Sequence, residues 1–126
     1  MENFKLYLER LTQKDIDDVE RNIDRVFASL NIDVEFTKHF VDRVNDARNG
    51  KDIEKDELED LFLKARQKYG NKIHDMKPSH EAVLTDVGTW INLPFVLNKN
   101  GNDLELVAKT VMRKKNFLTR TKKLFV

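Results

Sequence analysis

The chain has 126 residues, 40% of them hydrophobic and 36% charged, which suits one compact domain with a well-solvated surface. Cysteine is absent, which excludes disulfides, Cys-ligated zinc and thiol catalysis, fits a reducing cytosol and makes a cytoplasmic location the expectation. No apolar run of about 18 residues is present, and the first ten residues lack a signal-peptide core, so we expect neither a membrane span nor secretion.

The net charge of +1 conceals an uneven distribution along the chain. Residues 1–62 hold 17 acidic and 10 basic side chains, for −7, whereas residues 63–126 hold 5 acidic and 13 basic, for +8. The basic part of such a dipolar chain can attract a polyanion. Alternatively, the two halves pack together and partly neutralise each other.

Apolar periodicity predicts helices at the start of the chain. Residues 2–11 fit a short helix, although their alternation also fits a strand. Over 13–30 apolar residues recur at steps of three and four, and Thr12 with Asp15 resembles a capping box, so a helix is predicted. Its single apolar stripe is typical of packing against a core, and the alternative is a partner protein bound along helix 13–30.

An extended segment and two more helices are expected next. Residues 32–36 alternate between apolar and acidic side chains, which indicates a short strand. Thr37 is a good N-cap for a helix over 38–49. A further helix is predicted with Glu54 as its N-cap, with a hydrophobic staple and half a capping box, and Gly70 is expected to close it.

The apolar period changes from near 3.6 to near 2 in the last part of the chain. Strands are predicted over 81–87, 90–98 and 104–112, and a last short strand over 124–126. Pro94 lacks a backbone donor, so its strand should lie at a sheet edge or be bulged there. The Asn- and Gly-rich segment between the second and third strands indicates a hairpin loop.

Helices followed by a meander predict an α+β fold, with N-terminal helices packed on one face of a small C-terminal antiparallel β-sheet. We expect a single domain over 1–126. Within it, residues 1–31 form accessory helices, residues 32–70 form the helical layer, and residues 81–126 form the antiparallel sheet and a basic tail.

Few motifs for chemistry are present. The three histidines, His39, His74 and His80, form no HExxH pair, and the four glycines form no phosphate-binding loop. No GxSxG nucleophile motif occurs. We therefore expect neither a metal nor another cofactor.

A set of polar residues remains as a candidate site for metal-independent RNA cleavage. Such cleavage needs a base for the 2′-hydroxyl, an acid for the leaving oxygen and cations beside the phosphorane. His39 and Arg43 lie one turn apart on the predicted helix 38–49, and Thr110 lies near the end of strand 104–112. The alternative is that an exposed His and Arg, with strand-end cations, only keep the surface soluble.

The C-terminal segment offers phosphate contacts without requiring chemistry. After Glu105 no acidic residue follows. Phe117 can stack on a base, and cations can bind phosphates. The predicted nucleic-acid-binding residues are Lys109, Arg113, Lys114, Lys115, Phe117 and Arg120. The alternative function is a non-enzymatic phage, host-interaction or structural protein that binds a polyanion or an acidic protein surface with this segment.

Three segments resemble a known family: FTKHFVDRVNDARN, DIEKDELEDLFLKA and LELVAKTVM. Over roughly residues 33–115 the chain is similar to the barnase–EndoU–colicin–RelE group of small toxin-type ribonucleases. Many members are metal-independent and come from toxin–antitoxin systems and phages. The resemblance implies that His39, Arg43 and Thr110 are active-site positions, and that Arg113 or Lys114 holds phosphate. It also implies a bacterial cytoplasm and a possible phage origin, and it leaves out residues 1–31 and the basic tail.

Overall fold

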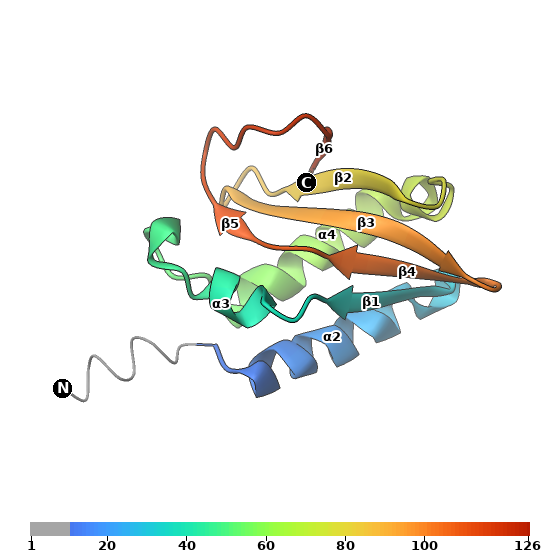
Figure 1. The fold of residues 1–126 in the computed structure, drawn as a ribbon, viewed down its shortest axis with the longest axis horizontal. Helices are drawn as coiled ribbons and strands as arrows, with labels where there is room; N and C mark the ends of the chain where they lie inside the picture. Colours follow the sequence, from blue (N-terminus) through green and yellow to red (C-terminus); the bar gives the residue numbers. More distant parts are fainter. Residues whose placement is uncertain (1–10) are drawn as a thin grey trace.

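The computed structural model describes residues 11–126, so the element expected over 2–11 lies almost entirely outside the described residues (Figure 1). The helices are α2 (Gln13–Phe27), α3 (Phe40–Val44) and α4 (Lys55–His74), with 3₁₀ turns η1 (Ala28–Leu30) and η2 (Ala47–Asn49). The strands are β1 (Ile32–Phe36), β2 (His80–Thr85), β3 (Ile91–Asn100), β4 (Asp103–Ala108), β5 (Met112–Arg113) and β6 (Lys122–Phe125).

The fold is α+β as predicted, but the sheet is mixed and not purely antiparallel. Its order is β1-β4-β3-β2-β6, and β5 also pairs with β3. β2, β3 and β4 form the predicted antiparallel meander, whereas β1 runs parallel to β4 and β6 runs parallel to β2. The alternating pattern identified 32–36 as extended. That pattern does not show which strand the segment pairs with. Because it pairs with β4, β1 belongs to the sheet and not to the predicted helical layer.

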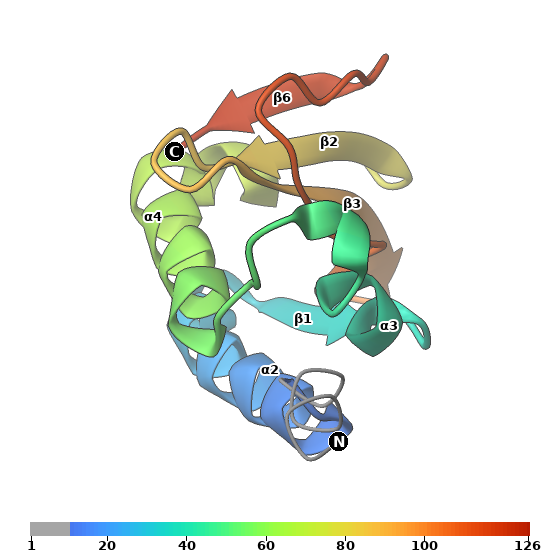
Figure 2. The same cartoon turned by 90° about the vertical axis from the view of Figure 1, so that its left-hand side faces the viewer.

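α2 and α4 form a helical layer on one side of the sheet (Figure 2). The stripe of α2 is buried at Ile16, Val19, Ile23 and Phe27, and it joins the core with side chains from α4 and the strands. Helix 13–30 therefore buries its apolar stripe within this chain. α2 carries the predicted capping box, Thr12 with Asp15, and α4 has one at Glu54 with Glu57, where half a box was predicted.

The helix predicted over 38–49 is wrong in extent, because it is broken into α3 and η2. Asn45 turns its side chain to the chain before α2, where Oδ1 accepts the Leu11 N–H and Nδ2 donates to the Leu11 carbonyl. Asp46 then caps η2 by accepting from the Arg48 N–H. Asn and Asp side chains that bond to the backbone compete with helix continuation. Thr37 does not cap α3, whose N-cap is His39.

α4 runs past Gly70, where the sequence predicted its end. A Cβ added at Gly70 would lie 2.9 Å from Nη1 of Arg66 and 3.2 Å from Cδ1 of Leu30. The glycine therefore permits a close approach between α4 and the end of η1 instead of closing the helix.

The predicted strand 104–112 is interrupted, and Pro94 explains why. β3 is a central strand, so of the two expectations for Pro94 the bulge is confirmed and the sheet edge is not. The ladder stops at Phe95 with Ala108 and resumes at Asn92 with Met112, which leaves one extra residue on the partner side. This bulge lies opposite Pro94, which has no N–H to donate and accepts instead from the Lys109 N–H at 2.9 Å.

Candidate nucleic-acid interface

The start of α3 is joined to the end of β4. The Thr37 N–H donates to the Ala108 carbonyl at 3.1 Å, and its hydroxyl donates to the Lys109 carbonyl at 2.8 Å. Because β1 and β4 are parallel, both strands end at the same side of the molecule (Figure 1). The segment with His39 and the segment with Thr110 therefore lie side by side.

The three predicted catalytic residues share a region but do not bond to one another. The His39 side chain is 73% exposed, and its Nδ1 lies 3.9 Å from Oδ2 of Asp42. Arg43 is exposed, and Thr110 is half-buried in the bulge. Within residues 11–126, no hydrogen bond or ion pair joins the side chains of His39, Arg43 and Thr110. Their joint role therefore stays a prediction.

Arg113 is committed to the protein and not to solvent. Its Nη1 and Nη2 donate to the Glu57 carboxylate at 3.2 and 2.7 Å. The carbonyls of Lys51, Asp52 and Thr89 accept from Nε, Nη2 and Nη1 at 3.2, 2.7 and 2.8 Å. These bonds use all the N–H donors of the guanidinium, and the side chain is 12% exposed. Arg113 therefore fixes β5 against the start of α4 and has no donor left for phosphate.

A buried asparagine fixes the start of the basic segment. Asn92 is fully buried, and its Nδ2 lies 3.2, 3.2 and 2.9 Å from the carbonyls of Trp90, Met112 and Lys114. Its Oδ1 accepts from the Thr85 hydroxyl at 2.9 Å. The Lys114 N–H also donates to the Trp90 carbonyl at 2.9 Å. This bonding places Trp90 beside the beginning of the loop.

Trp90 is a candidate binding residue that the sequence interpretation missed. Nζ of Lys115 lies 5.8 Å from its ring centroid, and the ring is partly exposed. Its φ of +60° is unusual for a bulky side chain and marks local strain. Trp90 is the only tryptophan of the chain, and this was the available signal, but the apolar pattern predicts only that it begins a strand.

The loop from β5 to β6, residues 114–121, arches away from the sheet (Figure 1). Lys114, Lys115 and Arg120 are exposed on it, and Phe117 is half-buried. Within residues 11–126, none of these three cations has a carboxylate partner. We name Trp90, Lys114, Lys115, Phe117 and Arg120 the basic loop surface.

The remaining predicted phosphate contact, Lys109, already has an ion partner. Its Nζ lies 2.6 Å from Oε1 of Glu81, and both side chains are about half exposed. A pair this exposed contributes little to stability and is readily exchanged for another partner. Lys109 is therefore weaker as a phosphate ligand than the cations of the basic loop surface.

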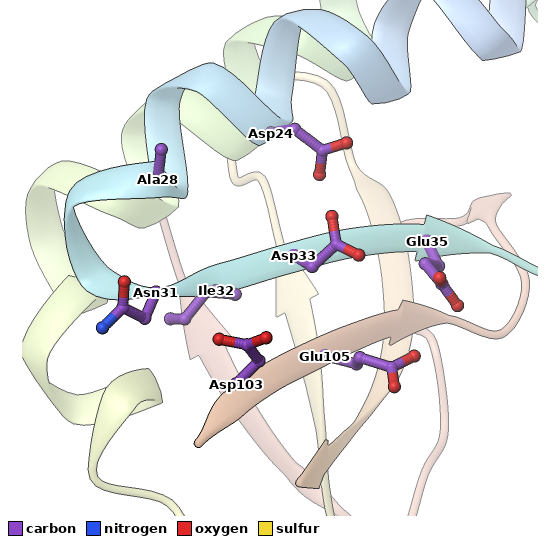
Figure 3. A pocket seen from close by; sticks show the side chains of 8 residues that line it. All are labelled: Asp24, Ala28, Asn31, Ile32, Asp33, Glu35, Asp103 and Glu105. Carbon is purple, nitrogen blue, oxygen red and sulfur yellow. The ribbon is translucent and has the colours of Figure 1, made fainter. Parts of the chain in front are cut away.

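An acidic groove of about 430 Å³ lies along β1 and β4 (Figure 3). Its carboxylates are Asp24, Asp33, Glu35, Asp103 and Glu105. Four of them lie on β1 and β4 and Asp24 lies on α2, whereas the cations of the basic loop surface follow β5, so the two charged surfaces are carried by different elements. Within the described residues, no group of three or more His, Asp or Glu is arranged to hold a metal ion.

Carboxylates of α2 also close the free edge of β1. Asp24 accepts the Val34 N–H at 2.7 Å, and Glu20 accepts the Phe36 N–H at 3.3 Å. Burial and the neighbouring carboxyl of Asp33 raise the pKa of Asp24 to about 6, although the bond from Val34 acts in the opposite direction. The edge strand is thus shielded from other strands at an electrostatic cost.

Asp24→Asn should therefore stabilise the protein above about pH 6 and not below about pH 4. The folded state binds more protons than the unfolded state between these values, so wild-type stability falls as pH rises through this window. For a buried group the rise of the pKa from 3.8 to about 6 would correspond to about 3 kcal/mol. Solvent screening reduces the expected gain to about 1 kcal/mol.

Urea unfolding of Asp24→Asn and wild type across this pH range measures the difference. Asp24→Ala is the matched control, because it removes the charge and also leaves the Val34 N–H without its acceptor. The asparagine oxygen can keep that bond. A constant difference between Asp24→Asn and wild type from low to neutral pH would contradict the prediction.

Comparison of the chain with protein-family models, with curated proteins and with solved structures gives no match. Among helices of the described residues, none is long and apolar enough to cross a membrane. Fold and surface chemistry are therefore the basis for the proposal that follows.

Proposed function

We propose that the protein binds the backbone of single-stranded nucleic acid, and in particular RNA, on the basic loop surface. The carrying observation is the Trp90 ring beside Lys115, on a surface whose other cations have no carboxylate partner in the described chain. Proteins that bind single strands combine aromatic faces for the bases with cations along the backbone. Lys114 and Arg120, both exposed, add cations before and after Phe117 in the sequence of the loop.

The fixed backbone that carries the aromatic ring supports the proposal. Asn92 holds the Trp90 and Lys114 carbonyls together, and Arg113 holds β5 by five bonds. A backbone segment already held in position loses less conformational entropy on binding. The strain at Trp90, with its φ of +60°, is also typical of residues kept for a binding role.

Fluorescence anisotropy with a labelled oligoribonucleotide of roughly 16 nucleotides tests the proposal. Three phosphate contacts on a single strand predict a log–log salt slope of about −2, or about a 20-fold weaker affinity at ~200 mM than at ~50 mM salt. Lys114→Gln/Lys115→Gln should flatten this slope. The matched control is Lys68→Gln/Lys99→Gln, which removes the same charge from exposed sites outside the loop. Equal loss in both double variants would contradict a defined interface.

Trp90→Asn separates stacking from charge in the same assay. Asparagine tolerates the left-handed backbone, so the fold is kept while the ring is removed. Loss of one stacked base at 1–3 kcal/mol predicts roughly 5- to 150-fold weaker binding with the salt slope unchanged. No RNA binding at low salt, together with binding of an acidic protein surface, would favour the alternative of a non-enzymatic protein-interaction module.

Cleavage of the bound RNA by His39, Arg43 and Thr110 is the second candidate. The bonds of Thr37 to the end of β4 favour it, because they hold the helix with His39 beside the segment with Thr110. Incubation of the same RNA with EDTA should then yield products, and His39→Ala should slow them by about 10²–10⁴. Products that require Mg²⁺, or that persist unchanged in His39→Ala, would contradict this mechanism while leaving the binding proposal intact.

A further inference from the structure

A second cavity lies between the end of α4 and the strands β2 and β6. Its volume is about 350 Å³, and it is separate from the residues of the basic loop surface. The floor is apolar, formed by Met76, Ala82 and Leu124, of which Ala82 and Leu124 are buried. Cavities of this size with an apolar lining and a few charged groups are typical small-molecule sites.

The charged rim of the cavity has an excess of unpaired cations. Lys72 from α4 and Lys122 from β6 lie beside each other, and the ammonium of Lys122 lowers the pKa of Lys72. Within residues 11–126, neither lysine has a carboxylate partner. Two like charges at close range repel each other, and an anion between them would relieve that repulsion.

The carboxylates at the rim do not balance its cations, because Lys72, Lys77 and Lys122 line the cavity against only Asp75 and Glu81. Glu81 lies 2.6 Å from Nζ of Lys109, and Asp75 lies 3.2 Å from Nδ1 of His74. Lys77 and His80 add further nitrogen donors to the lining. The cavity therefore combines an apolar floor with paired ammonium groups whose charge is not balanced locally.

We propose that this cavity binds a small amphipathic anion, with a phosphate or carboxylate head between Lys72 and Lys122 and a short apolar body over Met76 and Leu124. Lysine ammonium groups bind either head as point charges. The apolar floor favours a ligand with an apolar body. Such a body buries apolar surface against the methyl and thioether groups, which a bare inorganic ion cannot do. This inference does not depend on nucleic-acid binding at the basic loop surface.

The experiment uses monobutyl phosphate as the probe and the methionine methyl groups as reporters. The chain has three methionines. Met76 lines the cavity, whereas Met112 lies in β5 and is an internal control. With ¹³C-methyl labelling, monobutyl phosphate should shift the Met76 resonance saturably and leave that of Met112 in place. n-Butanol and inorganic phosphate, which carry only the body or only the head, should bind at least about tenfold more weakly.

Substitutions at the rim complete the test. Lys72→Gln and Lys122→Gln should each raise the Kd for monobutyl phosphate by about tenfold, whereas Lys99→Gln, an exposed lysine outside the cavity, should leave it unchanged. Both rim variants should also raise the melting temperature of the free protein slightly, because the repulsion is removed. Equal shifts with n-butanol, an unresponsive Met76 methyl, or an unchanged Kd in both rim variants would overturn the proposal.

Discussion

Arg113→Ala is expected to lower the free energy of unfolding by about 3–5 kcal/mol, because it leaves the Glu57 carboxylate without its partner in a mostly buried site. The Glu57 side chain is 19% exposed, and the Arg113 side chain is 12% exposed. The same substitution leaves the carbonyls of Lys51, Asp52 and Thr89 without these donors. Arg113→Lys should recover only part of the loss, since an ammonium cannot reproduce the planar fork.

Urea unfolding monitored by circular dichroism measures this loss, with Arg120→Ala as the control. Arg120 is exposed on the loop, so its removal should change stability by no more than about 0.5 kcal/mol. A double-mutant cycle with Glu57→Gln gives the coupling within the pair. A loss below about 1 kcal/mol for Arg113→Ala would show that the buried network is not formed.

Acid should weaken the same pair in wild type. Burial alone would raise the pKa of Glu57, but the bonds from Arg113 and from the Glu54 N–H outweigh it, and the pKa is lowered. A lowered carboxyl pKa gives stability that is present above the unfolded value of about 4.3 and is lost as pH falls through the folded value. In Arg113→Ala the contribution of Glu57 to this acid dependence should shrink or reverse.

Asn92→Asp is expected to cost more than about 3 kcal/mol near neutral pH, although the two side chains have the same shape. The amide donors that face the carbonyls of Trp90, Met112 and Lys114 are replaced by a carboxylate oxygen. Each buried acceptor left unpaired costs about 1–3 kcal/mol, and an unpaired buried charge adds to this. Acid should restore part of the loss, because a protonated carboxyl can donate to one of the carbonyls.

Unfolding at neutral and acidic pH checks this result, with the exposed Asn102→Asp as the control for the added charge. Trp90 is the only tryptophan and lies beside the altered group, so its fluorescence reports locally. Its emission should shift to longer wavelength when the loop loses its anchor. Wild-type stability together with unchanged Trp90 emission would contradict the role assigned to Asn92.

Local features of the fold could be predicted from the sequence, and long-range pairings could not. Thr12 and Asp15 lie three residues apart, so their capping box is visible in the sequence and is confirmed. The parallel pairing of β1 with β4 joins residues such as Ile32 and Leu104, and no local pattern encodes that choice. At Gly70 a local signal gave a wrong prediction. Glycine is typical of helix ends, but here it permits close packing within the helix.

The candidate site also contains residues that could be predicted from local sequence and residues that depend on distant partners. The absence of acidic residues after Glu105 indicated the cations of residues 114–120, and those cations are exposed in the structure. The role of Arg113 depends on Glu57, which lies 56 positions earlier, so its burial could not be inferred from strand alternation. The bulge opposite Pro94 also shifts the alternation by one residue, and this places Arg113 inward.

The loop between β5 and β6 has both ends fixed by buried groups and a middle that contributes little to the core. Arg113 and Asn92 hold its start, and Leu124, buried in β6, holds its end. Its middle carries Leu118, which is 91% exposed. Doubling the length of a flexible loop costs only about 0.6 kcal/mol in closure entropy. Residues 115–120 are therefore a natural place for insertions, and a new recognition segment grafted there would be displayed without redesign of the sheet.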